Sequence, residues 1–432
     1  MQYVFKGWEF YTQEILTQNG VIEKSQEQSQ EQSQEQSQER SNESQLVYLF
    51  RAPVGSTKLM AYCSKDAAFR GEVESLSELY TTSPDFEMND AMRGSIPAIN
   101  LNYFEHIFGT IDLDRVIDYL TMTRLGFGKK KQITLLGLGD VGSMLTIGLK
   151  LLGGDVAESI GIYDISQTQK SRWEMELNQI AVNPALTINT IDQDALFSGD
   201  FFIFCASKGV PKVGEEGKDV RMIQFEENAK LISFYARLAR KACFKGIFAV
   251  VSDPVDLLCK QVFESSNVDD ETGVTDYKGL LPEQVIGFGL GVMDGRARYY
   301  SDQMQLNYAE KGRVFGPHGQ ALIVADDILS ENQEIALQLT KQVVEANLQM
   351  RELGYKPFVA PALSSGANAI VNLLAGNAHY SANFLKGVYW GGKNTQKCYG
   401  VDYERVRVSL ALRKRIETTY NVLEDTWIKL NA

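Results

Sequence analysis

One stretch of twenty residues decides the fold, and it reads ITLLGLGDVGSMLTIGLKLL, residues 133–152. An apolar run typical of a buried strand leads into a glycine-rich turn, and a second apolar run with helical character follows. Gly137, Gly139 and Gly142 have the GxGxxG spacing. A strand, turn and helix in this order predict an α/β fold with a phosphate site at the helix N-terminus.

Each glycine of this turn has its own physical role. Gly137 allows the tight turn, Gly139 lets the backbone approach a pyrophosphate, and Gly142 lets the helix pack closely on the strand. Asp140 and Val141 lie between the second and third glycines and are expected in the same cofactor-binding turn. The motif therefore predicts a dinucleotide cofactor.

A carboxylate at the end of the next predicted strand refines that prediction. The strand SIGIYDI brings Asp164 about twenty residues beyond the glycines. A carboxylate at this place accepts hydrogen bonds from the adenosine ribose and would repel a 2′-phosphate. The expected cofactor is NAD rather than NADP.

The chain around this motif alternates buried strand-like runs with helical stretches. The predicted strands are ITLLGLG, SIGIYDI, DFFIFCAS, GIFAVVSD and QVIGFGLG. Apolar runs separated by helices predict a doubly wound parallel sheet of the Rossmann type over residues 129–290. Longer amphipathic patterns follow, in NQEIALQLTKQVVEANLQMRELG and DYERVRVSLALRKRIETTYNVLEDTW. They predict a mixed α/β substrate domain over residues 291–432.

A small unit of unknown role precedes the motif, over residues 1–128. Short β-like runs, QYVFKGWEFYT, LVYLFRAPV and TKLMAYCS, flank a polar repeat at residues 25–45. The repeat contains no apolar residue, so it is expected to be a disordered loop between two halves of one unit. A helical pattern, DLDRVIDYLTMTRLGFG, ends the unit before the three lysines at 129–131.

Composition narrows the class of partner. The net charge of −12 and the pI near 5.0 argue against nucleic acid and against an anionic membrane surface. Five cysteines without CxxC spacing fit a reducing cytoplasm, and they give no reason to expect a metal. There is no basic, apolar leader and no run of eighteen apolar residues, so neither export nor a membrane span is expected.

Four segments downstream of the turn carry further chemistry: KGVPKVGEEGKDVRMIQFEENAKLI, VSDPVDLL, VIGFGLGVMDGRARYY and FGPHGQ. Their content and order resemble the lactate/malate dehydrogenase family, and the resemblance runs from about Gln132 to the C-terminus. It implies an NAD-dependent oxidoreductase, a homo-oligomer, that transfers a hydride between NAD(H) and a small L-2-hydroxy or 2-oxo acid.

The resemblance assigns three catalytic roles. His318 is one of three histidines and lies between two glycines, where a histidine alone is usually structural. As the family's proton-transfer residue it has a suitable pKa for accepting and donating the substrate proton. Asp294 is expected to hold the other ring nitrogen. Arg221, expected on a mobile loop, would polarise the carbonyl.

Substrate binding is expected at Arg296, Arg298, Asp253 and Lys212. One of the two arginines would bind the substrate carboxylate, and Lys212 would suit a second carboxylate as in malate. The family separates its aspartate and arginine by two residues, so alignment on Arg296 would put Met293 in place of the aspartate. Asp253 stands where the family has asparagine. The aspartate carboxylate brings negative charge next to an anionic substrate.

Two other functions are compatible with parts of the pattern. A catalytically silent NAD-binding sensor or scaffold would keep the glycine turn while Asp253 and the irregular arginine spacing disabled turnover. An NAD-using glycosidase is disfavoured because no convincing cysteine and histidine metal pair lies near the cofactor segments.

Overall fold

The computed structural model describes residues 1–23, 45–51, 59–64, 73–82, 95–123, 129–208, 218–319, 321–397 and 400–430. Residues 25–44 of the predicted disordered loop lie outside the described residues. Gln45, which that prediction included, instead begins a strand. No described helix combines the length and apolarity needed to cross a membrane.

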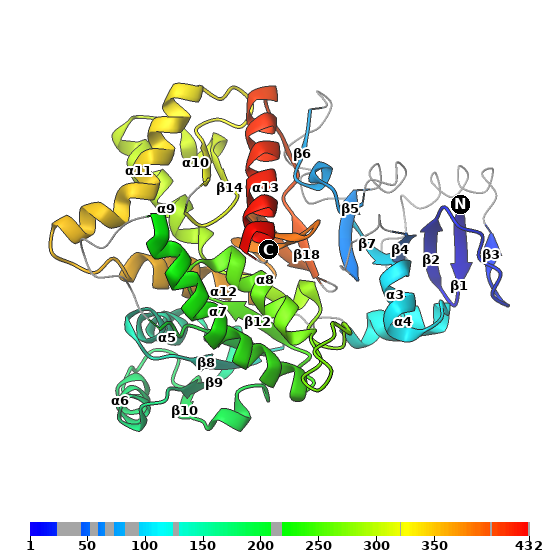
Figure 1. The fold of residues 1–432 in the computed structure, drawn as a ribbon, viewed down its shortest axis with the longest axis horizontal. Helices are drawn as coiled ribbons and strands as arrows, with labels where there is room; N and C mark the ends of the chain where they lie inside the picture. Colours follow the sequence, from blue (N-terminus) through cyan, green and yellow to red (C-terminus); the bar gives the residue numbers. More distant parts are fainter. Residues whose placement is uncertain are drawn as a thin grey trace.

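A doubly wound parallel sheet forms the centre of the molecule (Figure 1). Its parallel strands follow the order β10-β9-β8-β11-β12-β13. They are β8 (Lys131–Leu136), β9 (Ala157–Tyr163), β10 (Thr187–Thr190), β11 (Phe201–Phe204), β12 (Ile247–Val250) and β13 (Val285–Gly287). The helices that connect them are α5 (Asp140–Leu152), α6 (Gln167–Asn178), α7 (Lys218–Lys241) and α8 (Val255–Ser266). The predicted Rossmann-type fold and its five predicted strands are confirmed.

The same sheet continues with three antiparallel strands from the C-terminal part of the chain. They are β16 (Ala378–Leu385), β17 (Val388–Lys397) and β18 (Gly400–Tyr403), and β16 pairs with β13. Residues on both sides of position 290 therefore build one nine-stranded sheet.

The other C-terminal elements form a layer that carries the histidine loop. They are α9 (Leu290–Gln303), α10 (Tyr308–Lys311), β14 (Arg313–Phe315), β15 (Ile323–Ala325), α11 (Gln333–Glu352), the π-helix η5 (Pro361–Asn368), α12 (Ala369–Leu374), β19 (Val406–Arg407) and α13 (Leu410–Leu430). The expectation that the helical pattern begins at Asp402 is wrong. Asp402 lies within β18, and Val406 pairs with Tyr80. The helix α13 begins only at Leu410.

The N-terminal unit has its own six-stranded sheet, ordered β3-β1-β2-β4-β7-β5. Its elements are β1 (Gln2–Phe5), β2 (Trp8–Thr12), β3 (Ile22–Glu23), β4 (Gln45–Phe50), β5 (Met60–Ser64), β7 (Ser95–Asn100), α3 (Leu101–Phe108) and α4 (Leu113–Thr123). Because β2 pairs with β4, the chain before and after the polar repeat belongs to one unit, as predicted.

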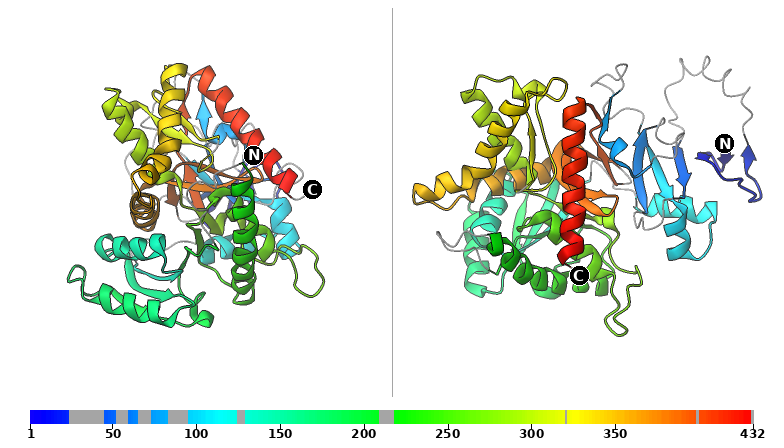
Figure 2. Two further views of the ribbon diagram at one scale, coloured as in Figure 1. Left: turned by 60° about the vertical axis from the view of Figure 1, so that its left-hand side comes forward. Right: turned by 45° about the horizontal axis from the view of Figure 1, so that its top comes forward.

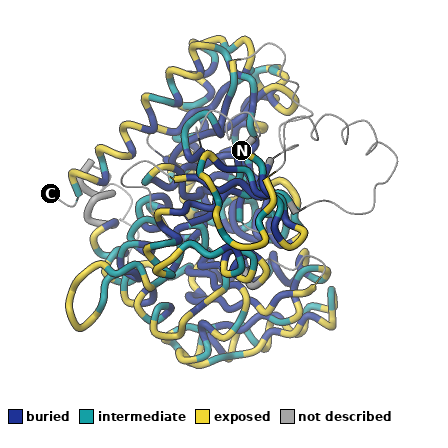
Figure 3. The backbone as a smooth tube through the Cα atoms, turned by 90° about the vertical axis from the view of Figure 1, so that its right-hand side faces the viewer, coloured by how far each residue is buried: buried dark blue, intermediate teal, exposed yellow. Residues whose placement is uncertain are grey.

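This unit is joined to the main body by backbone pairing. The short strand β6 (Tyr80–Thr81) pairs in parallel with β19, and Glu283 accepts a hydrogen bond from the Met60 backbone N–H at 2.9 Å. In Figure 2, right, α13 lies along the main body beside the strands of the N-terminal unit. Buried residues lie mainly in the interior of the molecule, and exposed residues lie mainly on its outer turns and helix faces (Figure 3).

The π-helix η5 fixes the distance between the glycine turn and the histidine layer. An added Cβ at Gly148 of α5 would lie 2.5 Å from Ala367, and one at Gly291 of α9 would lie 2.5 Å from the Ser364 carbonyl oxygen. The Ser365 hydroxyl donates to the Gly289 carbonyl at 2.6 Å and accepts from the Val292 N–H at 2.8 Å. The element therefore packs on α5 and α9 at once.

A buried ion pair ties the histidine layer to the sheet. Arg313 of β14 donates from Nε and Nη2 to the two carboxylate oxygens of Glu404, at 2.7 and 3.0 Å. Both side chains are less than a tenth exposed. Lys393 of β17 also lies 3.3 Å from Glu404. Since a buried carboxylate is costly without its partners, this pair holds β14 in place only as a complete set.

We expect Arg313→Met to lower the free energy of unfolding by about 3 kcal/mol, because Glu404 would stay buried with Lys393 as its remaining cation. Urea unfolding followed by tryptophan fluorescence measures the change. The double variant Arg313→Met/Glu404→Leu is the control and should lose clearly less. Equal losses in the two variants would show that shape, rather than the charge left unpaired, determines the effect.

Candidate active site

The glycine turn after β8 has the geometry of a phosphate cradle. Gly137 has φ +97°, and a Cβ there would lie 2.8 Å from the Ala206 backbone nitrogen. A Cβ at Gly142 would lie 1.8 Å from the Gly137 carbonyl oxygen. Gly139 is the N-cap of α5, and apart from its neighbours in the chain no atom of the described residues lies within 4 Å of its Cβ position. Two glycines are thus required for packing, and the third leaves open space at the helix N-terminus, where an anion is favoured.

Asp164 lies directly after β9 and is held toward this turn. One carboxylate oxygen accepts from the Leu138 N–H at 2.9 Å, and the other accepts from the Ser166 N–H at 2.8 Å. A carboxylate oxygen has more than one acceptor site, so both oxygens can still receive ribose hydroxyls. Ile165, the next residue, is 90% exposed.

The two residues between the glycines differ in environment. Val141 packs against the apolar core under the sheet. Asp140, in the first turn of α5, forms an ion pair with Lys356 at 2.7 Å, and both side chains are exposed. The segment after α11 therefore reaches the rim of the glycine turn.

His318 lies in the loop between β14 and β15, close to the start of α9. A Cβ at Gly289 would lie 2.8 Å from Cγ of the imidazole, so the ring packs where Gly289 has no side chain. The His318 backbone N–H donates to Asp256 Oδ2 at 2.9 Å. The His318 side chain is only 13% exposed.

Asp253 is the carboxylate that faces the imidazole. Its Oδ1 lies 3.5 Å from His318 Nε2, an ion-pair distance when the ring is protonated, and its side chain is 53% exposed. The fully buried Asn228 donates from Nδ2 to the Asp253 carbonyl at 2.9 Å and accepts the Lys208 N–H at 2.9 Å. Asn228 thus fixes the loops after β11 and β12 relative to each other.

The predicted hydrogen bond between Asp294 and the imidazole of His318 is not formed. Asp294 Oδ2 accepts from Arg298 Nε at 2.7 Å, and Oδ1 accepts from the Tyr308 hydroxyl at 3.0 Å. The reason is the position on the helix. Asp294 and Arg298 are five and nine residues beyond Gly289, and at 100° per residue they turn away from the face that meets His318.

Arg296 is seven residues beyond Gly289 and returns to the same face of α9. Its Nη1 donates to the Val343 carbonyl at 3.3 Å and lies 3.8 Å from the Met293 sulfur, and Nη2 donates to Asn347. Burial lowers the pKa of the guanidinium, and the negative charge of Asp253 opposes that shift. The half-buried Arg296 is therefore within electrostatic range of Asp253, and an arginine stays charged in such surroundings.

Two predicted residues have no described side chain. Lys212 lies outside the described residues. Arg221 lies in the first turn of α7 rather than in a loop before it, so that part of the expectation is wrong.

Sequence reasoning missed three residues that build this site. Asn228 was given no role from the sequence, although this fully buried asparagine has two loop partners and fixes the backbone of Asp253. Asp256 and Gly289 gave no local signal, because each acts through its distance from His318 in the folded chain.

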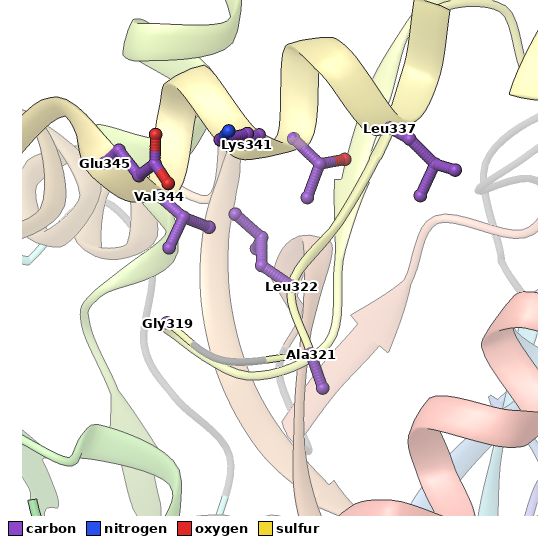
Figure 4. A pocket seen from close by; sticks show the side chains of 8 residues that line it. Gly319, Ala321, Leu322, Leu337, Lys341, Val344 and Glu345 are labelled. Carbon is purple, nitrogen blue, oxygen red and sulfur yellow. The ribbon is translucent and has the colours of Figure 1, made fainter. Parts of the chain in front are cut away.

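A separate pocket of about 230 Å³ lies against α11 (Figure 4). It lies between α11 and the residues Gly319, Ala321 and Leu322. Its lining also includes Leu337, Lys341 and Glu345, but neither His318 nor Asp253. We therefore do not assign the chemistry to it. Among the described residues, no three His, Cys, Asp or Glu side chains are grouped so that they could hold a metal ion.

The arrangement combines three capacities at one edge of the sheet. The turn after β8 can bind a pyrophosphate, and Asp164 after β9 can bind a ribose. The loop after β12 brings Asp253 to His318, and histidine is the side chain whose ordinary pKa suits proton transfer near neutral pH. Arg296 offers a positive charge close by.

Part of the chain is similar to known dehydrogenases. The family model described as lactate/malate dehydrogenase, NAD binding domain, matches residues 131–274. An L-lactate dehydrogenase 2 of Staphylococcus aureus is 27% identical over 197 residues, which cover 45% of this chain and 55% of that protein. The chain therefore spans about half the length of the curated relatives it matches.

Solved structures share the fold at lower identity. A lactate dehydrogenase from a Medee basin deep-sea metagenome library has a TM-score of 0.57 and 16% identity, and the match covers 70% of this chain and 100% of that one. A malate dehydrogenase of Archaeoglobus fulgidus, in complex with NADH, has a TM-score of 0.56 and 15% identity over the same shares. These similarities show the fold.

The two glycines of the turn should respond differently to one added methyl group. We expect Gly139→Ala to leave the melting temperature nearly unchanged and to weaken NADH binding at least 10-fold, because the methyl group enters open space beside the helix N-terminus. Gly142→Ala, the matched control, should lower the melting temperature, because its Cβ collides with backbone. NADH fluorescence titration and thermal unfolding measure both. Unchanged NADH affinity in a folded Gly139→Ala variant would contradict the cradle.

Proposed function

Because this chain is a divergent member of the lactate/malate dehydrogenase family, with its NAD-binding domain at residues 131–274, we propose that it interconverts a small L-2-hydroxy acid and its 2-oxo acid. One observation carries the proposal. The glycine turn, Asp164 and the Asp253–His318 pair all lie at the carboxyl edge of the parallel strands. In open α/β sheets this edge is where ligands bind.

The residues at this edge fit NAD. The open space at Gly139 and the N-terminus of α5 suit the pyrophosphate, and Asp164 suits the adenosine ribose. The exposed apolar side chain of Ile165 is placed next to Asp164, where it would cover one face of the adenine. When bound, the nicotinamide cofactor supplies or accepts the hydride.

His318 is proposed as the residue that moves the proton. During reduction of a 2-oxo acid, the imidazolium would give its proton to the carbonyl oxygen, and during oxidation the neutral ring would accept the hydroxyl proton. The imidazole is mostly buried and packs on Gly289, and these contacts restrict the orientation of the ring. The fixed orientation lowers the entropy lost when a substrate binds.

Arg296 is proposed as the residue that binds the substrate carboxylate, in preference to Arg298. Arg298 is engaged by Asp294 on the opposite side of α9, whereas Arg296 lies near Asp253. Arg296 makes contacts with Val343, Met293 and Asn347, which fix the guanidinium while other N–H groups stay available. This choice places Met293 where the family has its aspartate.

A silent NAD-binding protein is the second candidate, and one observation favours it. Met293 has no acid–base function, and the carboxylate next to His318 comes from Asp253, where the family has asparagine. Turnover separates the two candidates, since both of them bind the cofactor.

The test of function is turnover of 2-oxo acids with NADH, followed by absorbance across pyruvate, oxaloacetate and longer or branched analogues. We expect at least one substrate, and we expect His318→Gln to reduce turnover about 100- to 10,000-fold while NADH binding is retained. Binding of NADH with no turnover of any 2-oxo acid would favour the silent protein. A fully active His318→Gln variant would exclude this histidine from proton transfer.

The two arginines of α9 form a matched pair for a second test. We expect Arg296→Met to raise the Michaelis constant for the 2-oxo acid roughly 100-fold, because charge-assisted hydrogen bonds to the carboxylate are lost. Arg298→Met should leave that constant within about twofold and lower thermal stability instead, since it breaks the contact with Asp294. Initial rates and thermal unfolding of both variants give the comparison. The reverse pattern would assign the carboxylate to Arg298.

A further inference from the structure

A carboxylate from an unexpected element faces the side chain of His318. Asp253, in the loop after β12, places Oδ1 3.5 Å from Nε2. The imidazole is mostly buried, whereas the carboxylate is half exposed. The pair therefore connects an enclosed proton-carrying group with solvent.

Both partners are held in place by contacts that need no ligand. The imidazole lies against Gly289, and the His318 backbone N–H is bonded to Asp256. The Asp253 backbone is bonded to Asn228, which is itself bonded to Lys208. Such fixed backbones on both sides distinguish the pair from a chance surface contact.

Two other acidic residues on the elements around His318 have contacts of their own. Asp256 accepts the His318 backbone N–H, so one of its oxygens fixes the loop. Asp294 is bonded to Arg298 and Tyr308 on the far side of α9. Met293, on the face of α9 that carries Arg296, is buried among apolar side chains and cannot supply charge. Among the described residues, the contacts above place Asp253 and Asp256 near His318, and Arg296 within electrostatic range of Asp253.

We propose that Asp253 is the positioning carboxylate of His318, which orients the ring and stabilises its protonated form in place of a carboxylate on α9. The effect of Asp253 on catalysis rests on the proposed function, whereas its effect on the orientation and protonation of His318 does not. During reduction, the imidazolium loses one proton to the substrate oxygen and becomes neutral. The negative charge of Asp253 then favours the return of one proton from solvent.

The ring itself can be titrated without any substrate. The chain has three histidines, His106, His318 and His379, and burial lowers the pKa of His379 to about 4. Long-range ¹H–¹⁵N spectra of histidine-labelled protein would therefore contain few signals, and loss of one signal in His318→Gln assigns it. The titration midpoint of His318 is then measured in the wild type, in Asp253→Asn and in the matched control Asp294→Asn.

We expect Asp253→Asn to lower the midpoint by roughly one pH unit, because a nearby negative charge favours the imidazolium. Asp294→Asn should leave the midpoint unchanged and lower the melting temperature. An unchanged midpoint in Asp253→Asn overturns the proposal, and so does an equal fall in Asp294→Asn. Circular dichroism confirms that each variant is folded before it is compared.

The pH profile provides the catalytic readout. Reduction of a 2-oxo acid requires the protonated ring, so activity falls as pH rises through the ring's titration. In Asp253→Asn we expect activity to fall at a lower pH, displaced by the same interval as the titration midpoint of His318. Asp253→Glu should move the pH of this fall part of the way back to the wild-type value. If no 2-oxo acid is reduced, the proposed function fails, while the titration of the ring still decides whether Asp253 holds His318.

Discussion

Parallel pairing of β8 with its neighbours is the constraint on which the rest of the site depends. Because β8, β9, β11, β12 and β13 all run the same way, their carboxyl ends meet at one edge. Residues far apart in sequence, such as Gly137, Asp164, Asp253 and Gly289, are brought to the same edge of the sheet by this pairing. His318 arrives from outside this set of strands, and the missing side chain of Gly289 is what allows its ring to approach.

The features that sequence reasoning found are those with a local signal. Buried strands such as Phe201–Phe204 are apolar throughout, and the GxGxxG turn needs only the residues next to it. The strand β10 was missed because Thr187–Thr190 is short and buries only Ile188. The addition of β16–β18 to the main sheet could not be predicted from the sequence either, because tertiary packing selects the antiparallel partner of β13.

Assignment of Asp294 failed for a geometric reason. The sequence allowed two alignments with the family, one with Arg296 and one with Arg298 as the carboxylate-binding arginine. The helix resolves them, because neighbouring residues on α9 differ by 100° in direction. A shift of one residue therefore carries a side chain from the histidine loop to the Arg298 and Tyr308 cluster. Distances in the folded chain, which a single sequence does not contain, were needed to find Asp253 as the neighbour of the ring.

The N-terminal unit contacts the main body next to β18, the edge strand of the nine-stranded sheet. The last strand in the order of the main sheet is β18, and an uncovered strand edge presents unpaired backbone groups to other chains. Here β5 packs against β18, and β6 pairs with β19 immediately after it (Figure 1). The N-terminal unit thus occupies the side from which a foreign strand would add to the sheet. A sheet edge covered in this way is less accessible to a strand of another chain, and this covering does not involve the site at the carboxyl ends of the parallel strands.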